Sequence, residues 1–314
     1  MGHRHDHDHD HDHGHGHTHD HAGRVDDALC DSDAGIRAVK ISLVALSVTA
    51  VIQIAIVVAS GSVALLADTI HNFSDALTAI PLWIAFSLSR RSATKRYTYG
   101  LGRAEDLAGL FVVGVIAISA IVTAAEAIHR LIHPAPLSHL GWVAAAGIVG
   151  FLGNEVVALY RIRVGRRIGS AALRADGMHA RADGLTSLAV VLGAVGVALG
   201  FPQADPIVGL LIAAAIAVVM VVAARDVFAR LLDGVDPSLV DTAYDTLARQ
   251  PGVAGVQRVR MRWVGLRLDA DVELDVSPQL SLKQAHELAH EAEHALAHAI
   301  PKLDNAVVHA YPAG

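Results

Sequence analysis

Six apolar stretches constrain the fold of this chain more than any other feature of its sequence. Two of them, residues 62–88 and 172–200, carry ionisable residues near their middle. The other four are continuous, and each is long enough to cross roughly 30 Å of hydrocarbon: residues 39–59, 107–128, 141–160 and 206–224. The composition agrees, because 53% of the residues are hydrophobic but only 4% are aromatic, which is unlike an average soluble enzyme. We therefore predict an α-helical membrane protein with six transmembrane helices.

Lysine and arginine gather in alternate connections between these stretches. The connections 89–106 and 161–174 each hold five lysine or arginine residues, whereas the three other connections hold only Arg130. Because positive residues stay on the cytoplasmic side, this pattern predicts a cell-membrane protein with both termini in the cytoplasm. The N-terminus lacks the features of a cleavable signal peptide, and the single Cys30 excludes an internal disulfide framework. A net charge of −6 argues against nucleic acid as a partner.

The first 37 residues form a separate region, which begins with a run of histidines that alternate mainly with aspartate or glycine. Such a segment has no apolar surface to bury, so we expect residues 1–37 to be a disordered cytoplasmic tail. Its imidazole groups are typical ligands of borderline divalent ions. The tail is therefore expected to collect metal ions loosely, and a transmembrane domain over 38–232 follows it.

The region 233–314 has the pattern of a small cytoplasmic domain. Residues 238–250 have helical periodicity, and 256–276 alternate as a hairpin with its turn at Val264 and Gly265. Ser281 and Gln284 resemble a capping box, which opens a helix expected to reach Ala299 and to bury Leu282. A last strand is expected around 306–308. The order αββαβ predicts a ferredoxin-like α+β domain with helices on one face of an antiparallel sheet.

The two stretches with ionisable residues contain the same motif, D-x-x-H-x-x-x-D. It consists of Asp68, His71 and Asp75 in the second stretch, and of Asp176, His179 and Asp183 in the fifth. Offsets of three and four residues place each set on one stripe of a helix. A single polar residue inside a membrane often only joins helices, but two matching sets favour a ligand-binding role.

A divalent cation would offset the unfavourable insertion of these groups. His71, Asp75, His179 and Asp183 offer two imidazoles and two carboxylates, a tetrahedral shell that Zn²⁺ accepts. The expected topology makes the two helices antiparallel, which places the four ligands near the midplane of the bilayer. Asp68 and Asp176 then lie toward opposite mouths of the site, where we expect vestibule or outer-shell roles.

With these motifs, the chain resembles the cation diffusion facilitator family. The six stretches, the two H-x-x-x-D motifs, the αββαβ domain and the stretch Gly-Leu-Gly-Arg-Ala-Glu at 100–105 carry the resemblance. It implies a homodimeric exporter of Zn²⁺, with Co²⁺ and Cd²⁺ as alternatives, that exchanges the ion for protons, needs no cofactor and is not an enzyme. It also implies that His71, Asp75, His179 and Asp183 are the transport ligands. Among the residues at the family's C-terminal metal positions, Asp271, His286 and His309 are able to bind a peripheral metal.

The stretch HELAHEAEH at 286–294 supports a different hypothesis, because it contains H-E-x-x-H. In a zinc protease, His286 and His290 would bind the metal and Glu287 would act as general base. A domain of this size leaves little room for a third ligand and a substrate groove. A membrane-tethered protease and a metal buffer that works through the histidine-rich tail therefore remain the alternatives to transport.

Overall fold

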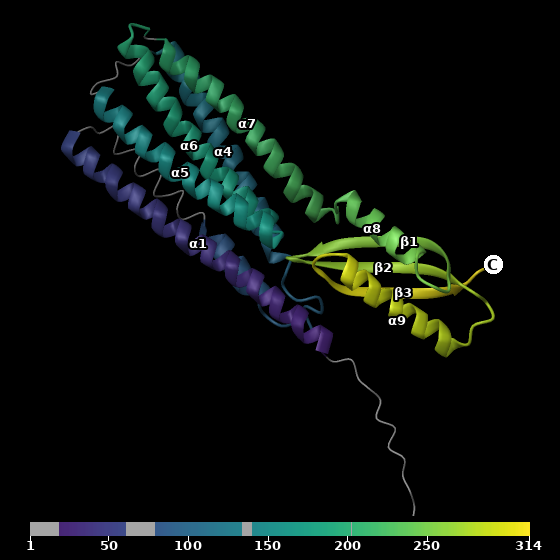
Figure 1. The fold of residues 1–314 in the computed structure, drawn as a ribbon. Helices are drawn as coiled ribbons and strands as arrows, with labels where there is room; N and C mark the ends of the chain where they lie inside the picture. The colour runs from purple at the N-terminus through teal and green to yellow at the C-terminus, as the bar shows by residue number, and fades with distance from the viewer. Residues whose placement is uncertain (1–18, 61–78, 134–139, 202) are drawn as a thin grey trace, which may run out of the picture.

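A bundle of long helices and a small α+β domain at one end of it make up the described part of the chain (Figure 1). The computed structural model describes residues 19–60, 79–133, 140–201 and 203–314. Five helices in this part are long and apolar enough to cross a membrane. A shorter apolar helix at Ala79–Ser89 covers the end of the stretch 62–88, the rest of which lies mostly outside the described residues. The helical membrane fold with a small α+β domain is thus confirmed.

The bundle comprises six helices within the described residues. Their bounds are α1 His19–Ser60, α3 Ala79–Ser89, α4 Ala104–Ile132, α5 Leu140–Ile168, α6 Ala171–Ala198 and α7 Ala204–Leu231. Helix α6 is central, since it packs against α5, α7 and α4 and buries 44% of its apolar span, compared with 17% for α7. The predicted site residues of the fifth stretch therefore lie inside the bundle.

Helix α1 begins at His19, so the prediction of disorder through residue 37 is wrong for its second half. Residues 1–18, which hold most of the histidine tract, lie outside the described part. Ile36 is buried in an apolar cluster with Phe86 of α3 and Leu173 of α6. This packing gives the helix tertiary support before the first apolar stretch begins, which composition alone does not reveal.

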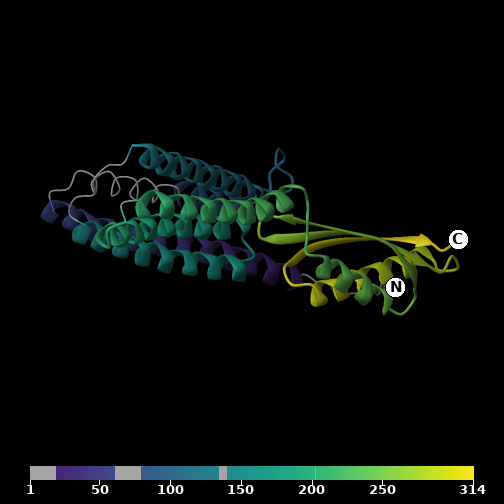
Figure 2. The ribbon, with the colours of Figure 1, turned by 90° about the horizontal axis from the view of Figure 1, so that it is seen from above.

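The α+β domain has the predicted order of elements. Its bounds are α8 Pro237–Ala248, β1 Val253–Val264, β2 Arg267–Val276, α9 Leu282–Ala299 and β3 Leu303–Pro312. Both helices cover the same face of the three-stranded sheet (Figure 2). The expectation of a wholly antiparallel sheet is wrong, because β2 pairs antiparallel with β1 but parallel with β3. The reason is that α9 carries the chain back along the sheet, which makes β2–α9–β3 a crossover connection.

Helix α9 starts at the predicted capping box. The Ser281 hydroxyl accepts a hydrogen bond from the Gln284 backbone N–H at 3.3 Å, and the Gln284 side chain accepts one from the Ser281 N–H at 2.9 Å. The helix buries Leu288, Ala292 and Leu296 against the sheet. Leu282 is 89% exposed, contrary to the prediction, because it precedes the first turn that contacts the sheet.

Replacing Ser281 tests this start of α9. We expect Ser281→Ala to destabilise the helix by about 1 kcal/mol, because the backbone N–H of Gln284 loses its acceptor and the Gln284 side chain loses the hydrogen bond from the Ser281 hydroxyl. Faster amide exchange confined to residues 282–285, measured by hydrogen-exchange mass spectrometry on the full chain, is the expected result. Ser281→Asp retains an acceptor oxygen and serves as control; equal exchange in the two variants would argue against the cap.

The tip of the β1–β2 hairpin joins the domain to the bundle. Leu266 is only 5% exposed and belongs to the apolar cluster formed by α1, α3, α4, α5 and α6. Gly265 approaches Gly102 so closely that a Cβ at either position would lie 3.0 Å from backbone atoms of the other segment. Nearby, Lys302 bonds Asp31 of α1 at 3.1 Å, and burial lowers the pKa of this lysine although the carboxylate opposes the shift. The hairpin is therefore built into the end of the bundle.

Candidate metal transport site

The candidate site is centred on two of the predicted ligand residues, which both lie on α6. His179 and Asp183 are 1% and 7% exposed, one turn apart on the helix. Their Nδ1 and Oδ1 atoms are 3.6 Å apart. Two donor atoms of one tetrahedral Zn²⁺, each at 2.0–2.2 Å, lie about 3.4 Å from each other. The pair is thus arranged nearly as two ligands of a single ion.

The other predicted residues of the membrane site cannot be placed. His71, Asp75 and Asp68 lie outside the described residues. Their role as ligands or vestibule residues therefore stays a prediction. Asp176 is described, and it is completely buried on α6, one turn closer to the α+β domain than His179.

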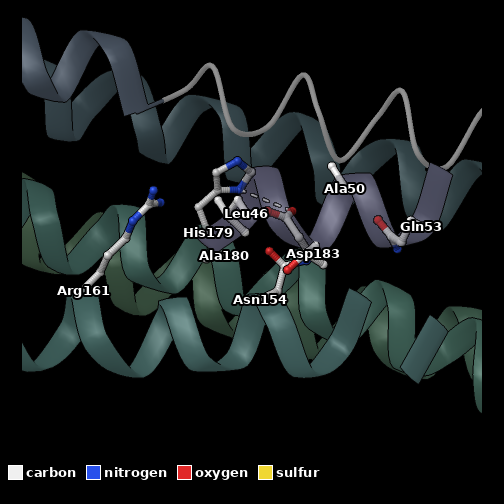
Figure 3. A pocket seen from close by; sticks show the side chains of 9 residues that line it. Leu46, Ala50, Gln53, Asn154, Arg161, His179, Ala180 and Asp183 are labelled. Carbon is white, nitrogen blue, oxygen red and sulfur yellow. Dashed lines mark ion pairs between the residues drawn. The ribbon is translucent and has the colours of Figure 1, made fainter. Parts of the chain in front are cut away.

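A small pocket beside His179 and Asp183 shows what surrounds them (Figure 3). Its volume is about 10 Å³, close to the space that one water molecule occupies. Helices α1, α5 and α6 enclose it, and the lining side chains are Leu46, Thr49, Ala50, Gln53, Asn154, Arg161, His179, Ala180 and Asp183. The pocket therefore has room for about one water-sized group, and it lies inside the helix bundle.

Glycines allow the helices to come close enough to form this pocket. A Cβ on Gly153 of α5 would lie 2.3 Å from Thr49 Oγ1 of α1, and one on Gly177 of α6 would lie 2.8 Å from Ile162 of α5. Small residues at helix contacts are the usual means of close packing within membranes. The α1, α5 and α6 backbones are thus held near the site by residues that carry no ligand atoms.

Three polar residues around the pocket were not predicted as part of the site. In the sequence, Gln53 and Asn154 fall within the apolar stretches 39–59 and 141–160, and Arg161 falls in the connection 161–174. In the structure Arg161 is inside α5 and 1% exposed, because α5 continues to Ile168. The sequence contains an indication of this, because residues 154 and 161 are seven apart and two polar residues at this spacing lie on one face of a helix.

Arg161 forms a buried ion pair with Asp176. Its Nη1 atom is 2.9 Å from Asp176 Oδ2, and the two side chains are 2% and 0% exposed. Another pair between the same helices, Arg181 with Glu155, is partly exposed and bidentate, at 2.7 Å and 3.2 Å. The Asp176 carboxylate thus has a specific cationic partner, in addition to its predicted place at the mouth of the site.

A single chain does not bring the predicted peripheral metal residues together. Asp271 and His309 are exposed on the sheet face opposite the helices, since the alternate residues of their strands pack against the core. His286 is exposed on α9, which covers the other face. Within the described residues, no group of three or more His, Cys, Asp or Glu is placed to hold a metal ion. A site using all three residues stays a prediction that needs more than one chain.

The H-E-x-x-H stretch also lacks the surroundings of a protease centre. His286 and His290 are exposed and their ring centroids are 6.4 Å apart, while His290 Nδ1 lies 3.2 Å from Glu293. His294 and His298 continue this exposed face. The described part of the domain supplies no third ligand beside them. We therefore interpret the stretch as a solvated helix face.

A buried imidazole–carboxylate pair lies beside a small pocket among helices that are long and apolar enough to cross a membrane, which is an arrangement suited to binding a cation. Residues 39–232 match the family of cation efflux transmembrane domains, and 235–313 match the cytoplasmic domain of cation efflux proteins. The chain belongs to the cation efflux family. Its members are transporters rather than enzymes, they need no cofactor, and the metal is their substrate.

Similar proteins come from several organisms. A probable cation efflux system protein of Mycobacterium tuberculosis is 66% identical over 292 residues, which cover 93% of this chain and 88% of that protein. The magnetosome protein MamB of Paramagnetospirillum magneticum is 28% identical, covering 72% and 77% of the two chains. The manganese efflux system protein MneS of Bacillus subtilis is 26% identical, covering 79% and 85%. The family match therefore extends over both domains, and among these three relatives the Bacillus protein alone is named for a particular ion.

Proposed function

We propose that this chain exports Zn²⁺ from the cytoplasm in exchange for protons, with Co²⁺ and Cd²⁺ as further substrates. The observation that carries the proposal is the buried pair of His179 and Asp183, whose donor atoms are spaced as two ligands of one tetrahedral ion. His71 and Asp75 complete the ligand set in the proposal. Alternating exposure of this site to the two sides of the membrane moves the ion.

The donor atoms support the choice of ion. Imidazole nitrogen suits Zn²⁺ and its neighbours, whereas Mn²⁺ and Mg²⁺ are bound mainly by oxygen ligands. The proposed set has two nitrogen and two oxygen donors, which favours a tetrahedral ion. The Bacillus relative is named for manganese, so Mn²⁺ is the essential comparison ion.

The same donors support proton exchange. A histidine must be neutral and an aspartate deprotonated to bind the metal, so protons and metal compete for the same atoms. When the emptied site faces an acidic exterior, protonation of these groups reduces rebinding of the ion. The protonated site then returns to the cytoplasmic side, where the higher pH removes the protons and the next ion binds.

We further propose that the protein is a homodimer in the cell membrane with both termini in the cytoplasm. The match of residues 235–313 to a cytoplasmic domain supports this orientation, as do the arginines near the end of the bundle that carries the α+β domain. In this orientation Asp176 lies between the cytoplasm and His179.

Transport into vesicles tests the proposal directly. The full chain is reconstituted in liposomes that enclose a zinc-sensitive dye, and the lumen is made acidic relative to the medium. We expect Zn²⁺ uptake that depends on the pH gradient and that is accompanied by release of protons from the lumen. Uptake that is unchanged after the gradient is collapsed would contradict proton exchange, and faster uptake of Mn²⁺ than of Zn²⁺ would contradict the proposed ion.

A further inference from the structure

The ion pair of Arg161 and Asp176 differs from a pair that serves to join two helices. Both side chains are almost completely buried, yet among the described residues their only polar contact is the one between Arg161 Nη1 and Asp176 Oδ2, while Arg161 Nε and Nη2 and Asp176 Oδ1 lack a hydrogen-bond partner. Replacing a buried pair by apolar residues is often neutral or stabilising, so such a pair is weak evidence for a structural role. The bidentate pair of Arg181 and Glu155 already links the same two helices.

The position of the pair points to the pocket. Arg161 lines the pocket together with His179 and Asp183, and it lies on the opposite side of them from Gln53 (Figure 3). Asp176 is one turn from His179, toward the end of α6 that is near the α+β domain. The two residues therefore stand at the end of the pocket that faces this domain, which is the cytoplasmic end in the proposed function.

The charges of the pair act on any cation in the pocket. An unpaired carboxylate one or two turns from the ion attracts a dication strongly, because the surroundings have a low dielectric constant. Arg161 compensates this charge, so that the pair as a whole is neutral toward the ion. Transport requires binding that is strong enough for entry but weak enough for release.

We propose that Arg161 sets the affinity of the transport site by neutralising Asp176, and that it keeps this carboxylate from trapping the cation. Arg161 is in this view a positioning residue and not a metal ligand. The inference rests on the proposed function, since it assumes that the pocket beside His179 and Asp183 receives the transported dication.

Variants of the two residues give shifts of opposite sign if the pair acts by charge. We expect Arg161→Gln to lower the dissociation constant for Zn²⁺ by about tenfold or more and to slow transport, because Asp176 becomes an uncompensated anion. Asp176→Asn should raise the constant by about tenfold or more, because Arg161 then repels the ion. The double variant should bind Zn²⁺ nearly as the unchanged protein does.

The measurement is Zn²⁺ titration of the full chain in detergent. The isotherm of the Asp183→Ala variant is subtracted, which removes binding by the histidine-rich tail. Arg181→Gln is the matched control, because it breaks an ion pair between the same helices that does not line the pocket. Thermal melting of each variant reports folding; if Arg161→Gln does not fold, weaker binding by Asp176→Asn and its restoration in the double variant carry the test.

Two outcomes would overturn the inference. One is that both single variants weaken binding, or that neither shifts it, as expected if the pair only holds α5 and α6 together. The other is that Arg181→Gln shifts the constant as much as Arg161→Gln. If subtraction of the Asp183→Ala isotherm leaves no binding at all, the proposed transport site itself is wrong, which distinguishes the two failures.

Discussion

Asp183→Asn should abolish transport of Zn²⁺ while the protein remains folded. The amide has nearly the same shape as the carboxylate, but it carries no charge, and Asp183 is 93% buried beside His179. Losing one partner of a buried charge contact costs about 3–5 kcal/mol. This corresponds to a loss of more than about a hundredfold in affinity for the ion. Initial rates of Zn²⁺ uptake by the reconstituted variant, measured over a range of concentrations, give the result.

The control for this experiment is the same substitution elsewhere in the bundle. Asp205 on α7 pairs with Arg130 at 3.3 Å and does not line the pocket, so Asp205→Asn should transport Zn²⁺. Zinc should also raise the melting temperature of the unchanged protein more than that of Asp183→Asn, because a ligand stabilises the state that binds it. If Asp183→Asn reaches half of its maximal uptake rate at the same Zn²⁺ concentration as the unchanged protein, Asp183 is not a ligand of the ion.

Arg230→Met should separate the α+β domain from the bundle. Arg230 on α7 is 6% exposed, and its guanidinium donates hydrogen bonds to the carbonyl oxygens of Gly265, at 2.9 Å, and Gly169. It also lies over the ring of Trp263, 4.1 Å from its centroid. The buried carboxyl groups of Glu105 and Asp106 interact electrostatically with it. Removing it leaves buried polar groups uncompensated, at about 3–5 kcal/mol.

The expected results are a lower melting temperature and faster protease cleavage in the connection 232–236. Arg225→Met is the matched control, since Arg225 is an exposed arginine on the same helix. Arg230→Lys should be intermediate, because an ammonium group keeps the charge but cannot reach two carbonyl groups with a planar fork. Cleavage rates that are equal in Arg230→Met and Arg225→Met would show that the junction does not depend on this residue.

The α+β domain could be predicted in detail because its signals are local. Alternation of apolar residues fixed β2, where Leu268, Ala270, Val272 and Leu274 are all buried, and the capping box located the start of α9. The direction of β3 was wrong because strand pairing is not local. Likewise, the exposure of Leu282 depends on where α9 first contacts the sheet, which its own sequence does not encode.

The candidate site was only partly predictable. His179 and Asp183 stand out because charged groups within an apolar stretch are unfavourable without a function. Arg161, Asn154 and Gln53 belong to other helices, and they meet at the pocket only through the rotation and close packing of α1, α5 and α6. The prediction for Arg161 was wrong because the apolar stretch ends at residue 160, which places Arg161 in a connection, whereas α5 continues to Ile168.

Because Leu266 packs among the helices of the bundle, a change in their arrangement would tilt the whole sheet. The sheet is anchored at the tip of the β1–β2 hairpin, which packs in the apolar cluster, and β1 extends away from this point. The 12 residues of β1 span about 40 Å at roughly 3.3 Å each. A tilt of about 5° at the tip therefore displaces the far end of the strand by about 3.5 Å. In the proposed transport cycle, a small rearrangement of the helices that pack against Leu266 would therefore cause its largest displacement at the far end of the sheet.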